Sequence, residues 1–209
     1  MTDEIEDYIL AHSDAEGELL RKLNRDTHVN MLRPRMLSGH LQGRILKMLC
    51  RMISPKYVLE LGTFTGYSAL CMAEGMEDDS ELHTVEADDE VEDFTRSYFE
   101  RSPYKDRIYF HIGDAMEVVP SIDRIFDMVF IDADKRHYID YYHLVFDKVK
   151  PGGFILADNT LWDGKVIDSK AHDPQTKGIL RFNDLVAADD RVEKVILPLR
   201  DGLTLIRKK

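Results

Sequence analysis

The stretch Tyr57–Ser68, which reads YVLELGTFTGYS, decides the fold. It begins with a short apolar run rich in β-favouring residues, as expected for a strand that is buried on both faces. Gly62 and Gly66 then bracket a turn, and helix-forming residues resume over Tyr67–Met76. A strand, a glycine-bearing loop and a helix in this order predict the opening of a Rossmann-like βαβ unit.

The glycine spacing of this loop differs from that of dinucleotide-binding loops. Those loops read G-x-G-x-x-G, because their backbone must approach a pyrophosphate at the helix N-terminus. Here the pattern is E-L-G-x-x-x-G, with Glu60 two residues before Gly62. A carboxylate at this point repels phosphate but suits an amino group or a sulfonium, which favours S-adenosylmethionine over NAD. The loop alone does not distinguish such a site from a plain strand-to-helix turn with glycines at positive φ.

Length and composition are those of a globular domain. The 209 residues suffice for one sizeable core, so we expect a single domain over 1–209. A formal net charge of −11 argues against nucleic acid as a partner. Cys50 and Cys71 lie in apolar helical patterns, which predicts reduced core thiols and a cytoplasmic location. The acidic start MTDEIEDY is unlike a signal sequence, and no apolar run reaches membrane-spanning length.

Strand and helix patterns alternate from the glycine loop to the C-terminus. Before the loop, amphipathic helices at Thr2–Ala11, at Ala15–Asn30 and from Ser38 onward predict a helical cap over 1–53, leaving 54–209 as the core. The alternation predicts an α/β fold with a doubly wound, mostly parallel sheet, an antiparallel C-terminal strand and ligands at the carboxyl edge. Beyond the first strand, further strands are expected at Glu81–Glu86, Arg107–Ile112, Met128–Ile131, Phe154–Ala157, Val192–Leu197 and Leu203–Ile206, helices at Tyr138–Lys148 and Thr176–Ala188, and a turn at Lys150–Gly153.

Acidic residues end the second and third strands. Glu86 lies 24 residues after Gly62 (86 − 62), near the interval of about 20 residues at which such folds place a ribose-binding carboxylate. A carboxylate there can accept hydrogen bonds from both ribose hydroxyls, although a solvated strand-end acid has the same appearance in the sequence. Asp114 and Ala115 follow the third strand, where an adenine could lie.

Two later strands end in oxygen-bearing side chains. Asp132, Asp158 and Asn159 supply only oxygen ligands, which suits a hard cation such as Mg²⁺ or Ca²⁺, and no Cys/His cluster indicates zinc. For Asp158-Asn159 an ordinary turn with a helix cap is the alternative. Lys135 follows Asp132 by three residues and could serve as a general base beside the cation, where its ammonium form is disfavoured; a surface lysine is the alternative.

Four ordered motifs resemble the cation-dependent O-methyltransferases, a family that includes caffeoyl-CoA and catechol O-methyltransferases. They are VLELGTFTGYSAL, VFIDADKRHY, LADNTLWDG and LPLRDGLTLIRKK, and the resemblance runs from Met36 to the C-terminus. It implies S-adenosylmethionine as cofactor, a divalent cation (Mg²⁺, with Ca²⁺ or Mn²⁺ as alternatives), a small phenolic or catechol acceptor and a homodimer. Asp163 stands where the plant members carry Asn, and the N-terminal region is shorter than theirs, so recognition of CoA thioesters is left open.

The resemblance also assigns residues. It implies that Lys135 is the base and that Asp201 contacts the acceptor, with Trp162 as a wall of the acceptor pocket unless it is a core residue. The implied metal ligands are Asp132, Asp158 and Asn159. The implied cofactor contacts are Ser38, Glu60, Gly62, Thr63, Ser68, Glu86, Asp114, Ala115 and Asp132.

The sequence therefore predicts a divalent-cation-dependent O-methyltransferase. A phenol is mostly protonated near neutral pH, because its pKa is about 10 as in tyrosine. Lys135 would remove the proton from a hydroxyl beside the cation, and the phenolate would attack the methyl group of the sulfonium in line. Two alternatives stay open: a protein that binds S-adenosylmethionine without turnover, and an NAD-type oxidoreductase, which the glycine spacing disfavours.

Overall fold

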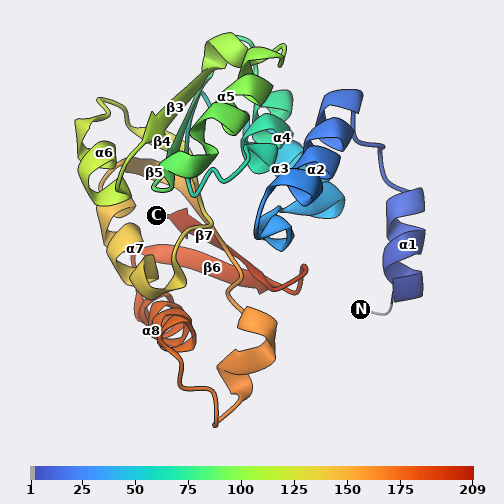
Figure 1. Ribbon diagram of the computed structural model, residues 1–209. Helices are drawn as coiled ribbons and strands as arrows, with labels where there is room; N and C mark the ends of the chain where they lie inside the picture. The colour runs from blue at the N-terminus through green and yellow to red at the C-terminus, as the bar shows by residue number, and fades with distance from the viewer. Residues whose placement is uncertain (1–2) are drawn as a thin grey trace.

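Seven strands form one sheet in the order β3-β2-β1-β4-β5-β7-β6 (Figure 1). This computed structural model describes residues 3–209. Within the sheet only β7 runs antiparallel to its neighbours, β5 and β6. The expected α/β fold, with a mostly parallel sheet and an antiparallel C-terminal strand, is confirmed. The strands are Tyr57–Leu61 (β1), Glu81–Glu86 (β2), Ile108–Ile112 (β3), Phe126–Ile131 (β4), Val149–Asp158 (β5), Val192–Leu197 (β6) and Leu203–Lys208 (β7).

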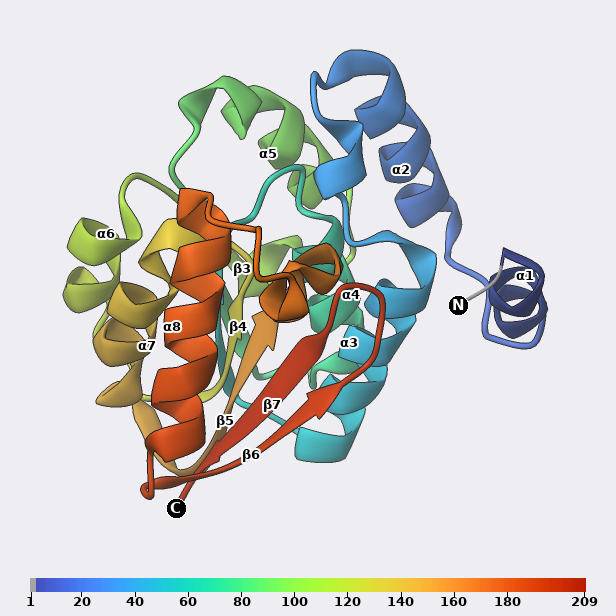
Figure 2. The same cartoon turned by 90° about the horizontal axis from the view of Figure 1, so that it is seen from below.

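Helices cover both faces of the sheet, and each face has its own core (Figures 1 and 2). Helices α2 to α5 pack on one face and α6 to α8 on the other. Every residue of the central strand β4 is buried, which explains its continuous apolar sequence. No helix in the described range has both the length and the apolarity of a membrane span. The helices are Asp3–Ala11 (α1), Glu18–Asn30 (α2), Gly39–Ile53 (α3), Tyr67–Gly75 (α4), Glu92–Glu100 (α5), Ala115–Ser121 (α6), Tyr138–Phe146 (α7) and Pro174–Ala188 (α8).

The turn predicted at Lys150–Gly153 is wrong, because β5 runs through it from Val149. The pairing of β4 with β5 shifts register between Phe126 and Met128, and Gly152 adopts a φ of 80°. The extra residues form an irregularity inside the strand, and regular pairing resumes at Phe154. Proline and glycine therefore mark a bulge here and not a chain reversal. Thr2, the predicted start of the first helix, lies outside the described residues.

Strand register brings the loops that carry the candidate residues to one edge of the sheet. Leu61 of β1 pairs with Ile131 of β4, which pairs with Ala157 of β5. The residues that follow these three, Gly62, Asp132 and Asp158, therefore lie side by side at the carboxyl edge. The pairing of β1 with β2 and of β2 with β3 brings Glu86 and Asp114 to the same edge.

Candidate active site

The loop after β1 lies against the end of β4. Gly62 has a φ of 94°, and a Cβ at this position would clash with the carbonyl oxygen of Asp132. The backbone amide of Asp132 donates to the carbonyl of Leu61 at 2.9 Å, which fixes this close approach. Gly66, with a φ of 86°, precedes the first residue of α4. Both glycines are thus required by backbone geometry, as expected for a loop that must turn sharply.

Glu60 lies beneath this loop and is completely buried. Its carboxylate accepts hydrogen bonds from the hydroxyls of Ser68 on α4 and Thr84 on β2, the latter at 2.5 Å. Burial raises the pKa of Glu60 to about 8, against the opposing effect of these two hydroxyls. Thr63 extends the network, because its hydroxyl lies 2.5 Å from that of Thr84. The structure thus engages Glu60, Ser68 and Thr63 in holding the loop.

Glu86 stands at the end of β2, half-buried beside the loop. Its Oε2 accepts the amide N–H of Phe64 at 2.6 Å and its Oε1 that of Asp88 at 3.0 Å. Asp114 is the N-cap of α6, where it accepts the amide N–H of Met116 at 2.8 Å, and Ala115 behind it is buried. These predicted cofactor residues lie at the ends of neighbouring strands, as their spacing indicated.

Asp132 and Lys135 form a partly buried contact just beyond β4. The Nζ of Lys135 donates to Oδ1 of Asp132 at 2.7 Å and lies 2.8 Å from the hydroxyl of Tyr138. Lys135 is only 7% exposed, so the surface-lysine alternative is excluded. Burial raises the pKa of Tyr138 well above its ordinary value, and its hydroxyl donates to the carbonyl of Asp158 at 2.9 Å.

Asp158 ends β5 and is 3% exposed. Its Oδ2 accepts from the side-chain amide of Gln42 at 2.6 Å, and its Oδ1 from the backbone N–H of Asn159 at 2.8 Å. Burial, followed by the negative charge of Asp132, raises the pKa of Asp158 to about 6. Asn159 adopts a left-handed φ of 57°, a conformation that asparagine tolerates better than most residues. A cation bound between two carboxyl groups at this edge of the sheet would reduce the electrostatic repulsion between them.

The residues at this edge fit a hard divalent cation. Among residues 3–209 no group of three or more His, Cys, Asp and Glu side chains is arranged to hold a metal ion. The predicted set differs from such groups, because one of its three members, Asn159, is an amide. Two carboxylates and an amide oxygen leave positions open for water and for acceptor oxygens, as Mg²⁺ sites commonly do.

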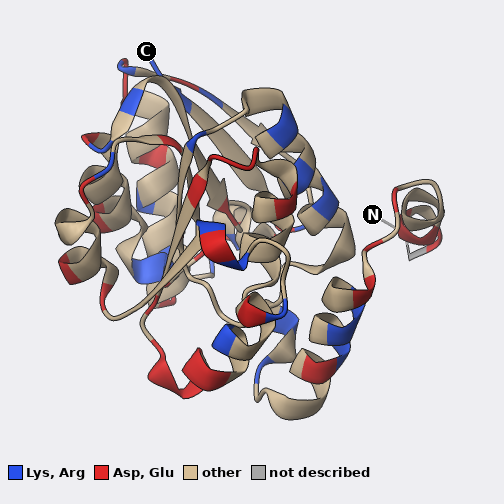
Figure 3. Cartoon of the chain, turned by 90° about the horizontal axis from the view of Figure 1, so that it is seen from above, with Lys and Arg blue, Asp and Glu red and all other residues tan. Residues whose placement is uncertain are grey.

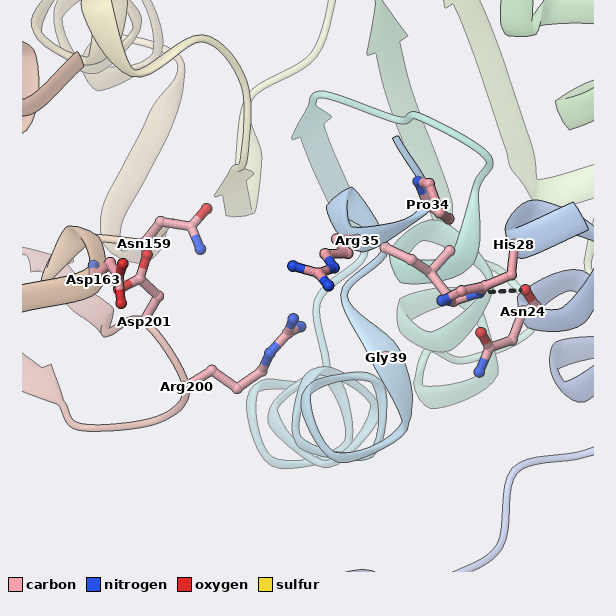
Figure 4. Close-up of a pocket in the computed structure, with 10 residues that line it drawn as sticks. Asn24, His28, Pro34, Arg35, Gly39, Asn159, Asp163, Arg200 and Asp201 are labelled. Atoms are coloured by element: carbon pink, nitrogen blue, oxygen red, sulfur yellow. Dashed lines mark hydrogen bonds between the residues drawn. The ribbon is translucent and has the colours of Figure 1, made fainter. Parts of the chain in front are cut away.

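A cavity of about 830 Å³ opens beside Asn159 (Figure 4). Asp201, for which the resemblance implied a contact with the acceptor, lines this cavity together with Asp163. Asp201 also accepts the backbone N–H of Asp163, which holds the two residues together. Ser38 is buried immediately before Gly39, another lining residue. Trp162 is not among the described residues that line the cavity; its ring packs, partly buried, against the core around α7 and α8.

Two buried polar residues of the site were missed in the sequence. Gln42 is 1% exposed and orients Asp158, and Thr84 is fully buried against Glu60. A single glutamine within a helix and a threonine within a strand are weak indications of a functional site, because most such residues serve only packing. Tyr138 was likewise assigned to a helix without a role at the site.

The model of the O-methyltransferase family matches residues 10–209. The chain belongs to the O-methyltransferase family. Among curated relatives of this O-methyltransferase, the caffeoyl-CoA O-methyltransferase of Petroselinum crispum is 36% identical over 180 residues, which cover 80% of this chain and 74% of the relative. The catechol O-methyltransferase of Niastella koreensis is 33% identical over 173 residues, which cover 78% of each chain.

Solved structures of O-methyltransferases resemble the whole chain. The O-methyltransferase of Bacillus cereus in complex with SAH has a TM-score of 0.92 at 28% identity, over 99% of this chain and 97% of that one. The O-methyltransferase TomG of Streptomyces achromogenes, in complex with SAM, has a TM-score of 0.92 at 26% identity, over all of both chains. The expected family and enzyme class are therefore confirmed: the chain is an S-adenosylmethionine-dependent O-methyltransferase, and the oxidoreductase alternative is set aside.

Proposed function

We propose that this O-methyltransferase requires a divalent cation and methylates a hydroxyl of a small phenolic or catechol acceptor. The observation that carries the proposal is the position of two carboxyl groups, those of Asp132 and Asp158, at the ends of the adjacent strands β4 and β5, next to the buried amine of Lys135. The names of the caffeoyl-CoA and catechol O-methyltransferases among the relatives support the acceptor class.

In this proposal Asp132, Asp158 and Asn159 hold the cation, Mg²⁺ in the first instance and Ca²⁺ or Mn²⁺ otherwise. A bound cation would make an adjacent acceptor hydroxyl more acidic and would fix its position. Lys135 takes the proton from that hydroxyl. Its Nζ lies within hydrogen-bond distance of Asp132, a proposed cation ligand, and is therefore close to the place where a cation-bound hydroxyl would lie. The acceptor oxygen then attacks the methyl group of the sulfonium, which the loop after β1 orients.

The remaining assignments have separate support. The cofactor contacts proposed for the residues around Gly62, Glu86, Asp114 and Asp132 rest on their shared position at the carboxyl edge. The helices over 3–53 are proposed to cap the site, since the segment before α3 contributes to the lining of the acceptor cavity. A cytoplasmic location is proposed from Cys50 and Cys71, which are buried, unpaired thiols.

The test of the cation is its removal. Methyl transfer to a catechol is expected to be lost in excess EDTA and to return with Mg²⁺, because the acceptor hydroxyl would lose its orientation and its increased acidity. Asp158→Ala is expected to weaken the dependence on Mg²⁺ far more than the affinity for S-adenosylmethionine, because Asp158 is assigned to the ion alone. Full activity in excess EDTA would exclude the proposed cation.

A further inference from the structure

The cavity beside Asn159 has acidic side chains on one side and arginine side chains opposite them. Asn159, Asp163 and Asp201 lie on one side, and the side chains of Arg35 and Arg200 point into the space between them and the segment before α3 (Figure 4). Arg35 belongs to the short 3₁₀-helix Pro34–Met36, and Arg200 to the turn that joins β6 to β7. Two segments far apart in the sequence thus place a guanidinium group each at the same cavity.

These two arginines have few partners in a chain with an excess of acidic residues. Eight other arginines form ion pairs with Asp or Glu. Within the described residues, Arg35 and Arg200 form none, and the side chain of Arg35 makes no hydrogen bond there either. Arg200 makes one, from Nη1 to the Oε1 of Gln42 at 2.9 Å. Since a guanidinium carries five N–H donors in a planar fork, most donors of both groups remain available to a ligand.

The contact of Arg200 with Gln42 links the cationic side of the cavity to the proposed cation site. The other end of the same Gln42 amide donates to Oδ2 of Asp158 at 2.6 Å. One amide group therefore separates the guanidinium of Arg200 from a proposed cation ligand. An acceptor whose hydroxyl lies beside Asp158 and Asn159 would carry a ring substituent to the arginines.

We propose that Arg35 and Arg200 bind a carboxylate carried by the acceptor, so that the preferred substrate is a catechol acid and not a neutral catechol. This inference rests on the proposed function and adds the charge of the substrate. A planar carboxylate matches the fork of an arginine, and such bonds are stronger than those between neutral groups. Asp163 and Asp201 stand on the opposite side, where they would repel an acceptor bound in the reverse orientation.

The experiment compares 3,4-dihydroxybenzoate with its methyl ester. The two share a ring, but the ester is neutral and its phenol is the more acidic, so intrinsic reactivity favours the ester. We expect the wild-type enzyme to show the higher kcat/KM with the acid. Arg35→Gln should lower kcat/KM for the acid about tenfold, mainly through KM, and leave that for the ester nearly unchanged. Arg200→Gln should also lower kcat/KM for the acid more than for the ester, with some loss for both, because Arg200 contacts Gln42, which holds Asp158. Calorimetric titration of the acid in the presence of S-adenosylhomocysteine and Mg²⁺ should show the same loss of affinity.

Arg181→Gln is the matched control, because Arg181 also lacks an ion pair among the described residues but lines a different cavity, next to α8. It should leave the preference for the acid intact.

Equal kcat/KM for acid and ester in the wild type would overturn the inference, and so would an equal loss for both substrates in Arg35→Gln. A different ligand is indicated if the wild-type enzyme prefers the caffeoyl-CoA thioester to free caffeate and the same variants abolish that preference. This result would overturn the inference, because the arginines would then bind a phosphate of CoA and not a carboxylate of the acceptor. If no catechol is methylated, the proposed function fails, whereas binding of the acid that disappears in Arg35→Gln still supports the inference.

Discussion

The contacts of Lys135 are compatible with two roles at this site, that of a counter-ion and that of a general base. In the structure its amine contacts Asp132 at 2.7 Å and the hydroxyl of Tyr138 at 2.8 Å. As an ammonium group it is the counter-ion of Asp132. A cation at Asp132 would take over that role, and the proposed function assigns the same amine to the acceptor hydroxyl. The same contact therefore suits both a structural ion pair and a base, and the kinetics of Lys135 variants distinguish the two roles.

We predict that Lys135→Ala lowers kcat by about 10²–10⁴, the usual range for losing a positioned proton transfer. The affinity for S-adenosylmethionine should change little, because Lys135 is not assigned to the cofactor. Raising the pH should partly restore the rate, since more of the phenol then ionises unaided. The measurement is kcat against pH for a series of catechols.

Lys135→Arg is the control for charge. A guanidinium stays protonated at any useful pH, so this variant should restore the counter-ion of Asp132 but not the rate. An acceptor with an acidic hydroxyl should suffer least from Lys135→Ala. Equal losses for acidic and ordinary phenols would contradict the role of base and assign Lys135 to positioning.

Glu86→Ala is predicted to weaken S-adenosylmethionine binding by about 1–3 kcal/mol, the value of hydrogen bonds to a charged group. The side chain also accepts the amide N–H of Phe64 in the loop after β1. Part of the lost affinity would therefore come from a less ordered loop. Titration calorimetry gives the affinity, and a melting curve without cofactor reports whether the fold persists. Unchanged affinity would remove Glu86 from the cofactor site.

At the scale of elements, Glu60 ties three of them together. It belongs to β1, and its carboxylate is held by Ser68 of α4 and Thr84 of β2. The glycine loop lies between these elements, so its conformation depends on a group that solvent does not reach. A carboxyl group buried in this way binds a proton more readily than in the unfolded chain.

This burial predicts a pH dependence of stability. The pKa of Glu60 rises from 4.5 to about 8 on folding, so the folded protein binds more protons between these values. The stability contributed by Glu60 is therefore full below about pH 4.5 and is lost as the pH rises towards about 8. Glu60→Gln mimics the protonated form and removes this titration. The melting temperature of the cofactor-free wild type, relative to that of Glu60→Gln, should fall across the same interval. Parallel profiles for the two proteins would contradict it.

At the scale of the whole molecule, α1 stands apart from the two helical layers (Figure 2). Ile5 and Tyr8 on this helix are 52% and 64% exposed. Acidic and basic residues are interspersed over the other elements, and no helix layer is uniformly basic (Figure 3). Helix α1 thus exposes two large apolar side chains among its acidic residues, and the interspersed surface charges give no support to nucleic acid as a partner.

We predict a homodimer, as the family resemblance implied, with α1 as part of its interface. Light scattering coupled to size exclusion should give about twice the chain mass of 24.2 kDa. The double variant Ile5→Ser, Tyr8→Ser should shift this mass towards that of one chain, because it removes apolar area from an exposed helix. Arg21→Ser, an exposed position on α2, is the control. A monomeric wild type would refute the dimer, and a variant that stays dimeric would exclude α1 from the interface.

The sequence by itself determined the sheet and the edge at which the site lies. A strand buried on both faces is a continuous apolar run, and it ends where a polar residue meets solvent or ligand. Gly62, Glu86 and Asp132 could therefore be placed at strand ends before any coordinates, and parallel pairing brings such ends together. The turn predicted at Lys150–Gly153 failed for a local reason, because glycine and proline mark a bulge as readily as a chain reversal.

Only the tertiary structure decided which side chains from distant segments meet at that edge. Gln42 reaches Asp158 across 116 positions of sequence, and Arg200 reaches Gln42 across 158. Such contacts depend on how α3 packs on the sheet and how the β6–β7 turn bends over it, and neither is encoded in a local pattern. Helical periodicity identifies the buried face of α3, but it does not indicate which buried polar residue contacts the site. The physical reason is that backbone hydrogen bonding and burial act on short segments, whereas the chemistry of a site is set by contacts that form once those segments have packed.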